Sequence, residues 1–338
     1  NKSVMSLKIL VAPDSFKDSL TSSEFCDIAK KSISKVQPDA DIHCVPLADG
    51  GEGTIDVFRS QVGYEYNIVS VKGPIGRQIK AEYCIDTKTD TAIIEMAQSS
   101  GLQLVPQKMR NPILTTSYGY GELILDAINR GSKNIILFIG GSATNDVGVG
   151  MLEALGFKYY NNENKKISGI VDNIEKIVRI DSPQIKDQLK KTSFTVGCDV
   201  LNSLLGPNGA TYTYGMQKGA NKNQLEKLER STKHFSKIAN QYNNIDFTNY
   251  DGAGAAGGVG FSAMSFLGAN LEPGFNIIEK RIGLKNKVSS NKYDLIITGE
   301  GCIDSQTEEG KLINHLAKIS HDSSIPLIAF CGTVRGKP

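Results

Sequence analysis

The chain has 338 residues, of which 38 are basic and 36 acidic, so its formal net charge is only +2. Because the basic residues form no block and are not interleaved with aromatic ones, we expect no nucleic-acid partner. Because the chain has no apolar run of about 18 residues and no leader pattern, we expect no membrane partner and place the protein in the cytoplasm.

The cysteines and the chain length indicate whether the protein has disulfides or structural zinc and how many domains it has. Six cysteines are scattered without C-x-x-C spacing, and most lie in or beside apolar runs. This distribution is typical of reduced, buried cysteines, so we predict neither disulfides nor structural zinc. A chain of this length exceeds the size at which one hydrophobic core stops growing, and two domains are therefore expected.

The N-terminal part alternates strands and helices. Apolar runs predict strands over 7–11 and 42–45, and each is followed by a helical pattern, within 22–36 and within 53–61. Such alternation is typical of a parallel sheet.

The next segment contains short strand patterns without helices between them. Short strand patterns cover 66–72, 78–85 and 91–96, and they are separated by Gly73-Pro74 and by the polar residues 86–90. Tight polar breaks between short strands predict hairpins or a mixed sheet.

The remainder returns to the strand and helix alternation. The predicted helices cover 116–129, 149–155, 223–241, 259–267 and 310–320, the predicted strands 134–139, 194–196, 294–298 and 327–330, and a polar connection 285–292. We interpret the whole as an α/β fold with two domains. Residues 1–68 and 270–338 are predicted to form a Rossmann-like parallel-sheet domain, and residues 69–269 a second, inserted α/β domain.

A glycine turn joins the strand that ends at 139 to the helix that begins at 149. Gly140 and Gly141 let backbone N–H groups approach a ligand, and Ser142 and Thr144 add hydroxyl donors. With Asn145 or the neighbouring aspartate capping the helix, this order of elements is typical of a phosphate site. The same residues also suit any strand-to-helix turn, so both interpretations stay open.

Three other strand ends carry similar loops. Asp14, Ser15 and Lys17 follow the first strand; the run Asp49, Gly50, Gly51 and Glu52 follows the second; Glu300 and Asp304 follow the strand 294–298. Ligands of open α/β sheets sit outside the carboxyl ends of the strands. We therefore predict one shared site formed by these loops and the glycine turn.

These motifs, in this order, resemble the glycerate kinase family, and more narrowly its bacterial type, which phosphorylates D-glycerate with ATP at the 2-hydroxyl. The likeness rests on residues 13–17, 48–54, 140–146, 198–200, 252–258 and 298–301 with Asp304, and further matches include 110–112 and 217–220. The resemblance implies ATP as phosphoryl donor and D-glycerate as substrate. The chain departs from the family pattern at Val147, where glycine is frequent, and at Cys302, where arginine is common.

Phosphoryl transfer needs a metal ion, phosphate ligands and a base near the acceptor hydroxyl. We assign Asp199 and Asp304 as Mg²⁺ ligand and general base, in either order, and Lys17 as a third catalytic residue. The proposed substrate and phosphate ligands are Asp14, Ser15, Asp49, Gly50, Gly51, Glu52, Gly140, Gly141, Ser142, Thr144, Asn145, Gly254, Gly257, Glu300 and Lys311. Each of the loop residues could instead serve only as a turn or cap residue.

One glycine motif supports a different class of function. Residues 252–257 match G-x-G-x-x-G, which would suggest an NAD-dependent oxidoreductase, but residues 247–251 before them are not a hydrophobic strand. A phosphate or substrate loop, or close packing of small residues, remains the better interpretation. Phosphorylation at the 3-hydroxyl and a non-catalytic sensor of glycerate also stay open, as does the oligomeric state.

Overall fold

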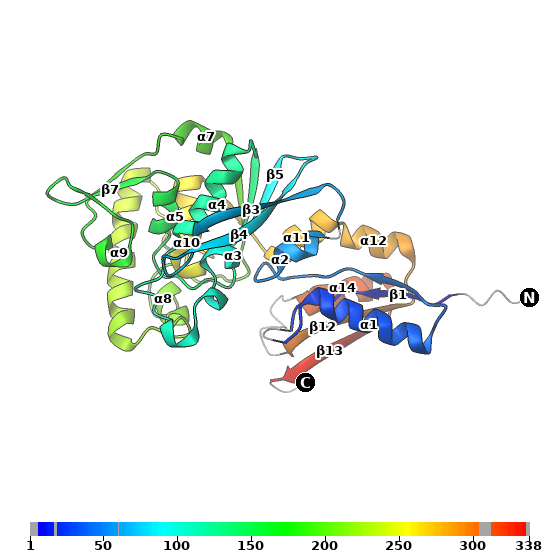
Figure 1. The fold of residues 1–338 in the computed structure, drawn as a ribbon. Helices are drawn as coiled ribbons and strands as arrows, with labels where there is room; N and C mark the ends of the chain where they lie inside the picture. The colour runs from blue at the N-terminus through cyan, green and yellow to red at the C-terminus, as the bar shows by residue number, and fades with distance from the viewer. Residues whose placement is uncertain (1–5, 17–18, 60, 304–311, 336–338) are drawn as a thin grey trace, which may run out of the picture. The chain divides into compact units, whose positions relative to one another are not determined.

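A computed structural model describes residues 6–16, 19–59, 61–303 and 312–335. The protein has a mixed α/β fold, as predicted, and separates into two compact units (Figure 1). The first unit comprises residues 1–62 and 273–338, and the second comprises residues 63–272. Whether these units fold independently, with the domain limits proposed above, stays a prediction.

The first unit contains a four-stranded sheet in the order β13-β12-β1-β2. Every neighbouring pair is parallel, which confirms the predicted parallel sheet. The strands are β1 (Lys8–Val11), β2 (Asp41–Cys44), β12 (Leu295–Ile303) and β13 (Leu327–Val334). The helices are α1 (Ser22–Val36), α2 (Thr54–Arg59), α11 (Gly274–Ile282), α12 (Leu284–Asn291) and α14 (Leu312–Ser323).

Local chemistry explains where α1 begins and which face it buries. Thr21 is its N-cap: the Thr21 side chain accepts a hydrogen bond from the Glu24 N–H, while the Glu24 carboxylate accepts one from the Thr21 N–H. This reciprocal arrangement satisfies two helix-end donors that would otherwise lack partners. Cys26 then packs with the strand residues Ile9 and Ile42 in the unit's core.

The predicted polar connection over 285–292 is wrong. That stretch forms α12, which buries Leu284 and Val288. Gly283 ends α11 with a φ of 65° and allows a second helix to begin at once. The two apolar residues are four positions apart and lie on one helical face. The other six residues of the helix are polar, so the sequence shows no clear apolar periodicity there.

The second unit contains a six-stranded mixed sheet in the order β11-β10-β6-β5-β4-β3. Its strands are β3 (Tyr64–Lys72), β4 (Gln78–Asp86), β5 (Thr91–Glu95), β6 (Asn134–Phe138), β10 (Ser193–Gly197) and β11 (Asn270–Glu272). The pairs β3-β4 and β4-β5 are antiparallel, and the other neighbours are parallel. The predicted hairpin within a mixed sheet is therefore confirmed.

Helices cover this sheet, and a small three-stranded sheet accompanies it. The helices are α3 (Ala97–Ser100), α4 (Tyr118–Asn129), α5 (Val149–Ala154), α6 (Val171–Ile174), α7 (Lys186–Lys191), α8 (Ala210–Tyr214), α9 (Lys222–Asn243) and α10 (Ala255–Leu267), and the small sheet consists of β7 (Lys158–Tyr160), β8 (Lys166–Ile167) and β9 (Arg179–Asp181). One apolar core runs through the unit and includes Ile94, Leu137 and Phe235.

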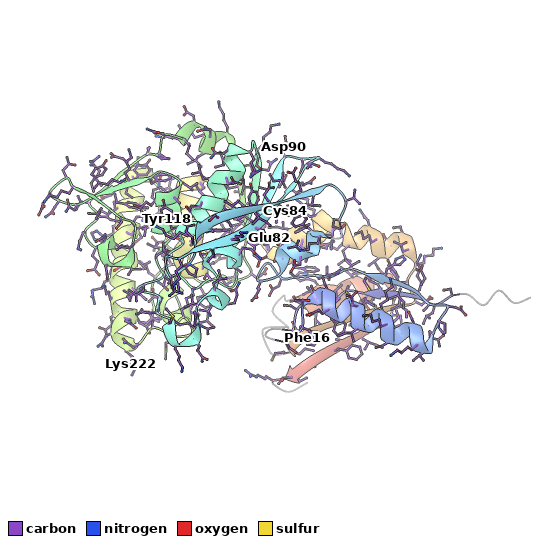
Figure 2. All side chains as sticks on the ribbon, viewed as in Figure 1. Phe16, Glu82, Cys84, Asp90, Tyr118 and Lys222 are labelled. Carbon is purple, nitrogen blue, oxygen red and sulfur yellow. The ribbon has the colours of Figure 1, made fainter. Side chains whose placement is uncertain are left out.

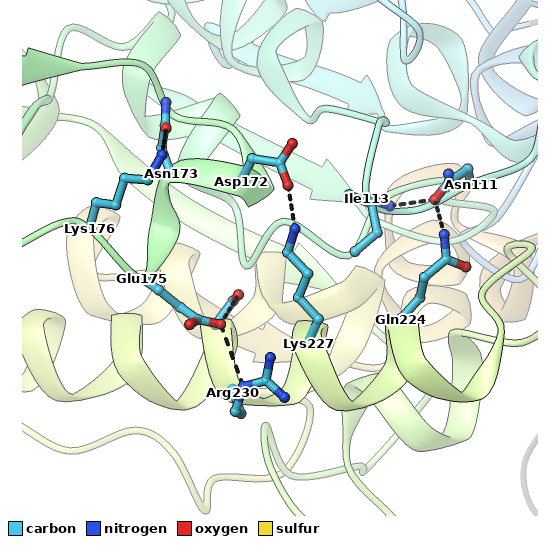
Figure 3. Close-up of polar contacts among 10 residues, drawn as sticks. Asn111, Ile113, Asp172, Asn173, Glu175, Lys176, Gln224, Lys227 and Arg230 are labelled. Atoms are coloured by element: carbon cyan, nitrogen blue, oxygen red, sulfur yellow. Dashed lines mark hydrogen bonds and ion pairs between the residues drawn. The ribbon is translucent and has the colours of Figure 1, made fainter.

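The long helix α9 shows how that core is enclosed. It buries Leu225, Leu228 and Phe235, while on its outer side Lys227 pairs with Asp172 of α6 (Figure 3). Such exposed ion pairs contribute little free energy, so the buried apolar face holds the helix in place. Within the described parts of the chain, no helix is long and apolar enough to span a membrane.

Candidate functional site

In the first unit, predicted site residues gather where the strand order reverses. β2 lies on one side of β1, and β12 and β13 lie on the other, so the β1–β12 boundary is the switch point at which open α/β sheets bind ligands. Asp14 follows β1 here, and its N–H donates a hydrogen bond of 2.8 Å to the carbonyl of Gly299. Glu300 is buried one residue further along, inside β12, so the predicted strand end at 298 is wrong: residues 299–303 continue the strand and pair with β13.

Phe16 explains why Gly299 must be small. Its ring stacks on Phe25 of α1, with 5.3 Å between ring centroids. A Cβ added at Gly299 would stand 2.8 Å from the Phe16 ring and 2.9 Å from the Phe330 carbonyl. The glycine therefore lets the loop after β1 close over the β12 strand.

Carboxylates dominate the electrostatics of this strand edge. Burial raises the pKa of Asp14 well above its ordinary value, and the charges of Asp49 and Glu300 raise it further, whereas the Ser15 N–H, which donates to Asp14 Oδ1 over 2.6 Å, lowers it. A cation would relieve this repulsion. Mg²⁺ prefers oxygen ligands and commonly uses only one or two carboxylates in proteins, so carboxylates of this kind fit a magnesium ion. Among the described residues, no three His, Cys, Asp or Glu side chains form a metal site by themselves.

The loop after β2 serves at least partly as a turn. Asp49 Oδ1 accepts a hydrogen bond of 2.9 Å from the Gly51 N–H, and the Thr54 hydroxyl at the start of α2 donates to the Gly51 carbonyl over 2.8 Å. Gly50 has a φ of 99°, a conformation that favours glycine. Glu52 is exposed. The turn explains these residue types, and a ligand role for Asp49, Gly50, Gly51 and Glu52 stays a prediction.

In the second unit, the predicted glycine turn lies between β6 and α5. Gly141 has a φ of 71° and is exposed, and a Cβ there would meet only the Ala97 Cβ, at 3.5 Å. The chain then turns inward, because Ser142 is 8% exposed, while Thr144 and Asn145 are almost completely buried. The loop thus presents its glycines to solvent and its polar side chains to the interior.

The expected helix cap needs correction. Neither Asn145 nor Asp146 is the N-cap of α5; that position belongs to Gly148, which has a φ of 76°. Asp146 instead accepts hydrogen bonds of 2.8 Å from both the N–H and the hydroxyl of Ser117, and one of 3.1 Å from the Gly148 N–H. Burial raises its pKa, while these donors oppose the rise. The buried Asp146 side chain therefore stabilises the loop by connecting it to Ser117.

Lys218, which the sequence did not single out, contacts two of the predicted site residues, Ser142 and Thr144. Its side chain is buried, and its Nζ donates to the Ser142 hydroxyl over 2.9 Å and to the Thr144 carbonyl over 2.6 Å. Burial lowers its pKa to about 7, although the charge of Asp146 acts in the opposite direction. One sequence signal was available, because residues 217–220 match the family, but most lysines are solvated and this one carries no distinguishing pattern.

The glycines of the second motif pack backbone against backbone. The Gly254 N–H donates to the Asn202 carbonyl over 2.8 Å, and a Cβ at Gly257 would stand 2.2 Å from the Thr144 carbonyl oxygen. Ala256, Gly257 and Gly258 all have positive φ, which produces a kink before the predicted helix 259–267. No strand precedes Gly252 within residues 244–251, so the context of a dinucleotide fingerprint is missing. Close backbone packing explains why both residues are glycine, and a ligand role for Gly254 and Gly257 stays a prediction.

Comparison with known proteins decides the family. The model of the "Glycerate kinase family" matches residues 9–338. The chain belongs to the glycerate kinase family. It is 39% identical to glycerate 2-kinase of Escherichia coli K12, over 97% of this chain and 86% of that protein, and 38% identical to glycerate kinase of Halalkalibacterium halodurans, over 96% and 85%.

A solved structure agrees with this assignment. The crystal structure of a protein assigned as glycerate kinase 2 from Salmonella typhimurium LT2 matches with a TM-score of 0.84 at 36% identity. The match covers 98% of this chain and 90% of that one. As a member of the glycerate kinase family, the protein is a kinase enzyme.

One departure from the glycerate kinase family pattern has a structural consequence. Val147, where glycine is frequent, has a φ of 48° and is completely buried. A β-branched residue in this left-handed region is strained. The Val147 N–H donates to the Gly257 carbonyl over 3.0 Å, and the Ser262 hydroxyl donates to the Val147 carbonyl. These contacts hold the backbone in the conformation that glycine would adopt freely.

The proposed catalytic residues are placed only in part. Asp199 is exposed and lies two residues after the end of β10. Lys17, Asp304 and Lys311 lie outside the described residues. Their roles as base, metal ligand and phosphate ligand stay predictions.

Proposed function

We propose that the protein transfers the γ-phosphoryl group of ATP to the 2-hydroxyl of D-glycerate, which yields 2-phosphoglycerate and ADP. The observation that carries this proposal is the family match over residues 9–338, together with relatives named glycerate kinase and, in Escherichia coli, glycerate 2-kinase. The name of that relative favours the 2-hydroxyl over the 3-hydroxyl.

The residues at the strand ends suit this chemistry. Phosphoryl transfer depends mainly on positioning the reactants and neutralising charge, and bound Mg²⁺ would supply part of that neutralisation. Asp14 and Asp49 offer carboxylate oxygens of the kind magnesium prefers. In the second unit, Gly140 and Gly141 leave backbone N–H groups accessible to an anion. Asp199 and Asp304 remain our candidates for metal ligand and general base.

An ADP-release assay tests the proposal. With ATP, Mg²⁺ and D-glycerate we expect steady release of ADP, with little release when glycerate is replaced by a hexose or when Mg²⁺ is omitted. Binding of glycerate without ADP release would favour a non-catalytic sensor. Binding of a nicotinamide cofactor, without ATP binding, would favour the oxidoreductase alternative.

A further inference from the structure

Lys218 is a buried lysine whose ammonium group contacts no carboxylate among the residues that the structure describes. Within the described residues its Nζ contacts two neutral acceptors, the Ser142 hydroxyl and the Thr144 carbonyl, and forms no ion pair. Only 3% of the residue is exposed. An ammonium group has three donors and is costly to bury without a counter-charge. One N–H and the positive charge are therefore available to a ligand.

The loop that contacts Lys218 contains two further buried polar atoms. Thr144 Oγ1 and Asn145 Oδ1 form no hydrogen bond with any described residue, although Asn145 Nδ2 donates to the Thr211 hydroxyl over 3.3 Å. Buried polar atoms in native proteins are almost always hydrogen-bonded, to protein, water or ligand. These two atoms belong to adjacent residues, and Lys218 contacts one of those residues, Thr144, through its backbone carbonyl; together they indicate a binding site for a polar ligand.

We propose that Lys218, Thr144 and Asn145 form a subsite for the carboxylate and a hydroxyl of a small hydroxy acid. This inference rests on the proposed function and identifies where the acceptor substrate would be recognised. The free N–H of Lys218 and the Thr144 hydroxyl donate to the carboxylate, and Asn145 Oδ1 accepts from a hydroxyl. A small monoanion fits this arrangement better than a nucleotide, because Ser142, Thr144 and Asn145 are buried and, within the described parts of the chain, Lys218 is the one cation that forms hydrogen bonds with them.

The protonation of Lys218 predicts how ligand affinity depends on pH. Without ligand, burial holds the pKa of Lys218 at about 7, and Asp146 is the titratable group whose charge opposes this shift. The residue next to Lys218, Gly219, is approached by Arg110, but the approach is through the Arg110 backbone carbonyl. A bound carboxylate favours the charged ammonium, so binding above pH 7 should take up a proton. The affinity should then fall about tenfold for each further pH unit, until the pKa of the complex is reached.

Two variants separate ligand binding from structure. Lys218→Met removes the charge at similar volume and should weaken D-glycerate binding about ten- to a hundredfold, the cost of one charge-assisted contact. Thr144→Val removes only the unpartnered hydroxyl, since Lys218 bonds to the Thr144 backbone. It should weaken binding several-fold without lowering the melting temperature. Lys222→Met, at an exposed lysine four residues from Lys218, is the matched control (Figure 2).

Calorimetric titration at pH 6.5 and 8.5, in two buffers with different ionisation enthalpies, measures affinity and proton uptake. We expect uptake by the wild type and by Lys222→Met, and none by Lys218→Met. Unchanged D-glycerate affinity in both Lys218→Met and Thr144→Val, with thermal melts showing folded protein, would overturn the subsite. Loss of ATP affinity alone would assign these residues to phosphate and overturn the carboxylate assignment.

Titration with glycolate, the simplest hydroxy acid, separates this inference from the proposed function. Glycolate binding that depends on Lys218, in a protein that does not phosphorylate glycerate, would support the subsite and contradict the kinase proposal. If neither glycolate nor D-glycerate binds, the subsite is wrong.

Discussion

Gly257→Ala should damage both stability and activity, because Gly257 supports the loop that contains Thr144 and Asn145. Its φ of 66° would strain alanine by about 1–2 kcal/mol. The new Cβ would also stand 2.2 Å from the Thr144 carbonyl oxygen and 2.6 Å from the Asn145 Cα, and such overpacking costs about 1–3 kcal/mol. Together these give roughly 2–5 kcal/mol, or a fall in melting temperature of about 4–20 °C for a unit of this size.

Gly268→Ala is the matched control for this variant. Gly268 ends the same helix with a φ of 64°, but a Cβ there would meet nothing within 4 Å. It should therefore cost only the strain of about 1–2 kcal/mol and leave kcat/KM for D-glycerate unchanged. For Gly257→Ala we expect kcat/KM to fall at least tenfold, measured by ADP release below the melting temperature. If the two variants behave alike in both measurements, our account of the loop is wrong.

Three further predictions address other parts of the molecule. Asp199→Asn should reduce kcat by about 10²-fold or more at an unchanged melting temperature, as expected for a lost general base or metal ligand, and near-normal turnover would remove Asp199 from the mechanism. Gly141→Val should weaken the binding of ATP or D-glycerate about ten- to a hundredfold in calorimetric titration, whereas a lower melting temperature with both affinities intact would make the glycine turn a scaffold. Residues 63–272 expressed alone should unfold cooperatively in a thermal melt; a non-cooperative melt would contradict their assignment as a domain.

The sequence predicted those parts of the fold whose signals are local. The strand before Gly140 and the helix after Gly148 stand on either side of a glycine turn, so apolar periodicity and turn chemistry agree. The break at Gly73-Pro74 likewise indicated the β3–β4 hairpin. In α12, by contrast, only Leu284 and Val288 are buried, and two apolar residues among polar ones do not reveal a helix.

The candidate site depends on contacts between residues far apart in the chain. Lys218 lies 76 residues from Ser142, and no local pattern indicates that its ammonium group is buried against that hydroxyl. The same holds for Asp146, whose residue type suits a helix cap but whose oxygens bind Ser117. Local chemistry predicts that a residue is polar and lies in a loop, whereas tertiary packing decides which partner it meets.

The identity of the phosphorylated product tests the central claim most directly. The protein is incubated with ATP, Mg²⁺ and D-glycerate, and the product is identified by NMR from the carbon that bears the phosphate. The proposed function predicts 2-phosphoglycerate. Phosphate on the 3-hydroxyl would contradict the assigned acceptor position, and the absence of any phosphorylated glycerate from folded protein would contradict the proposed function itself.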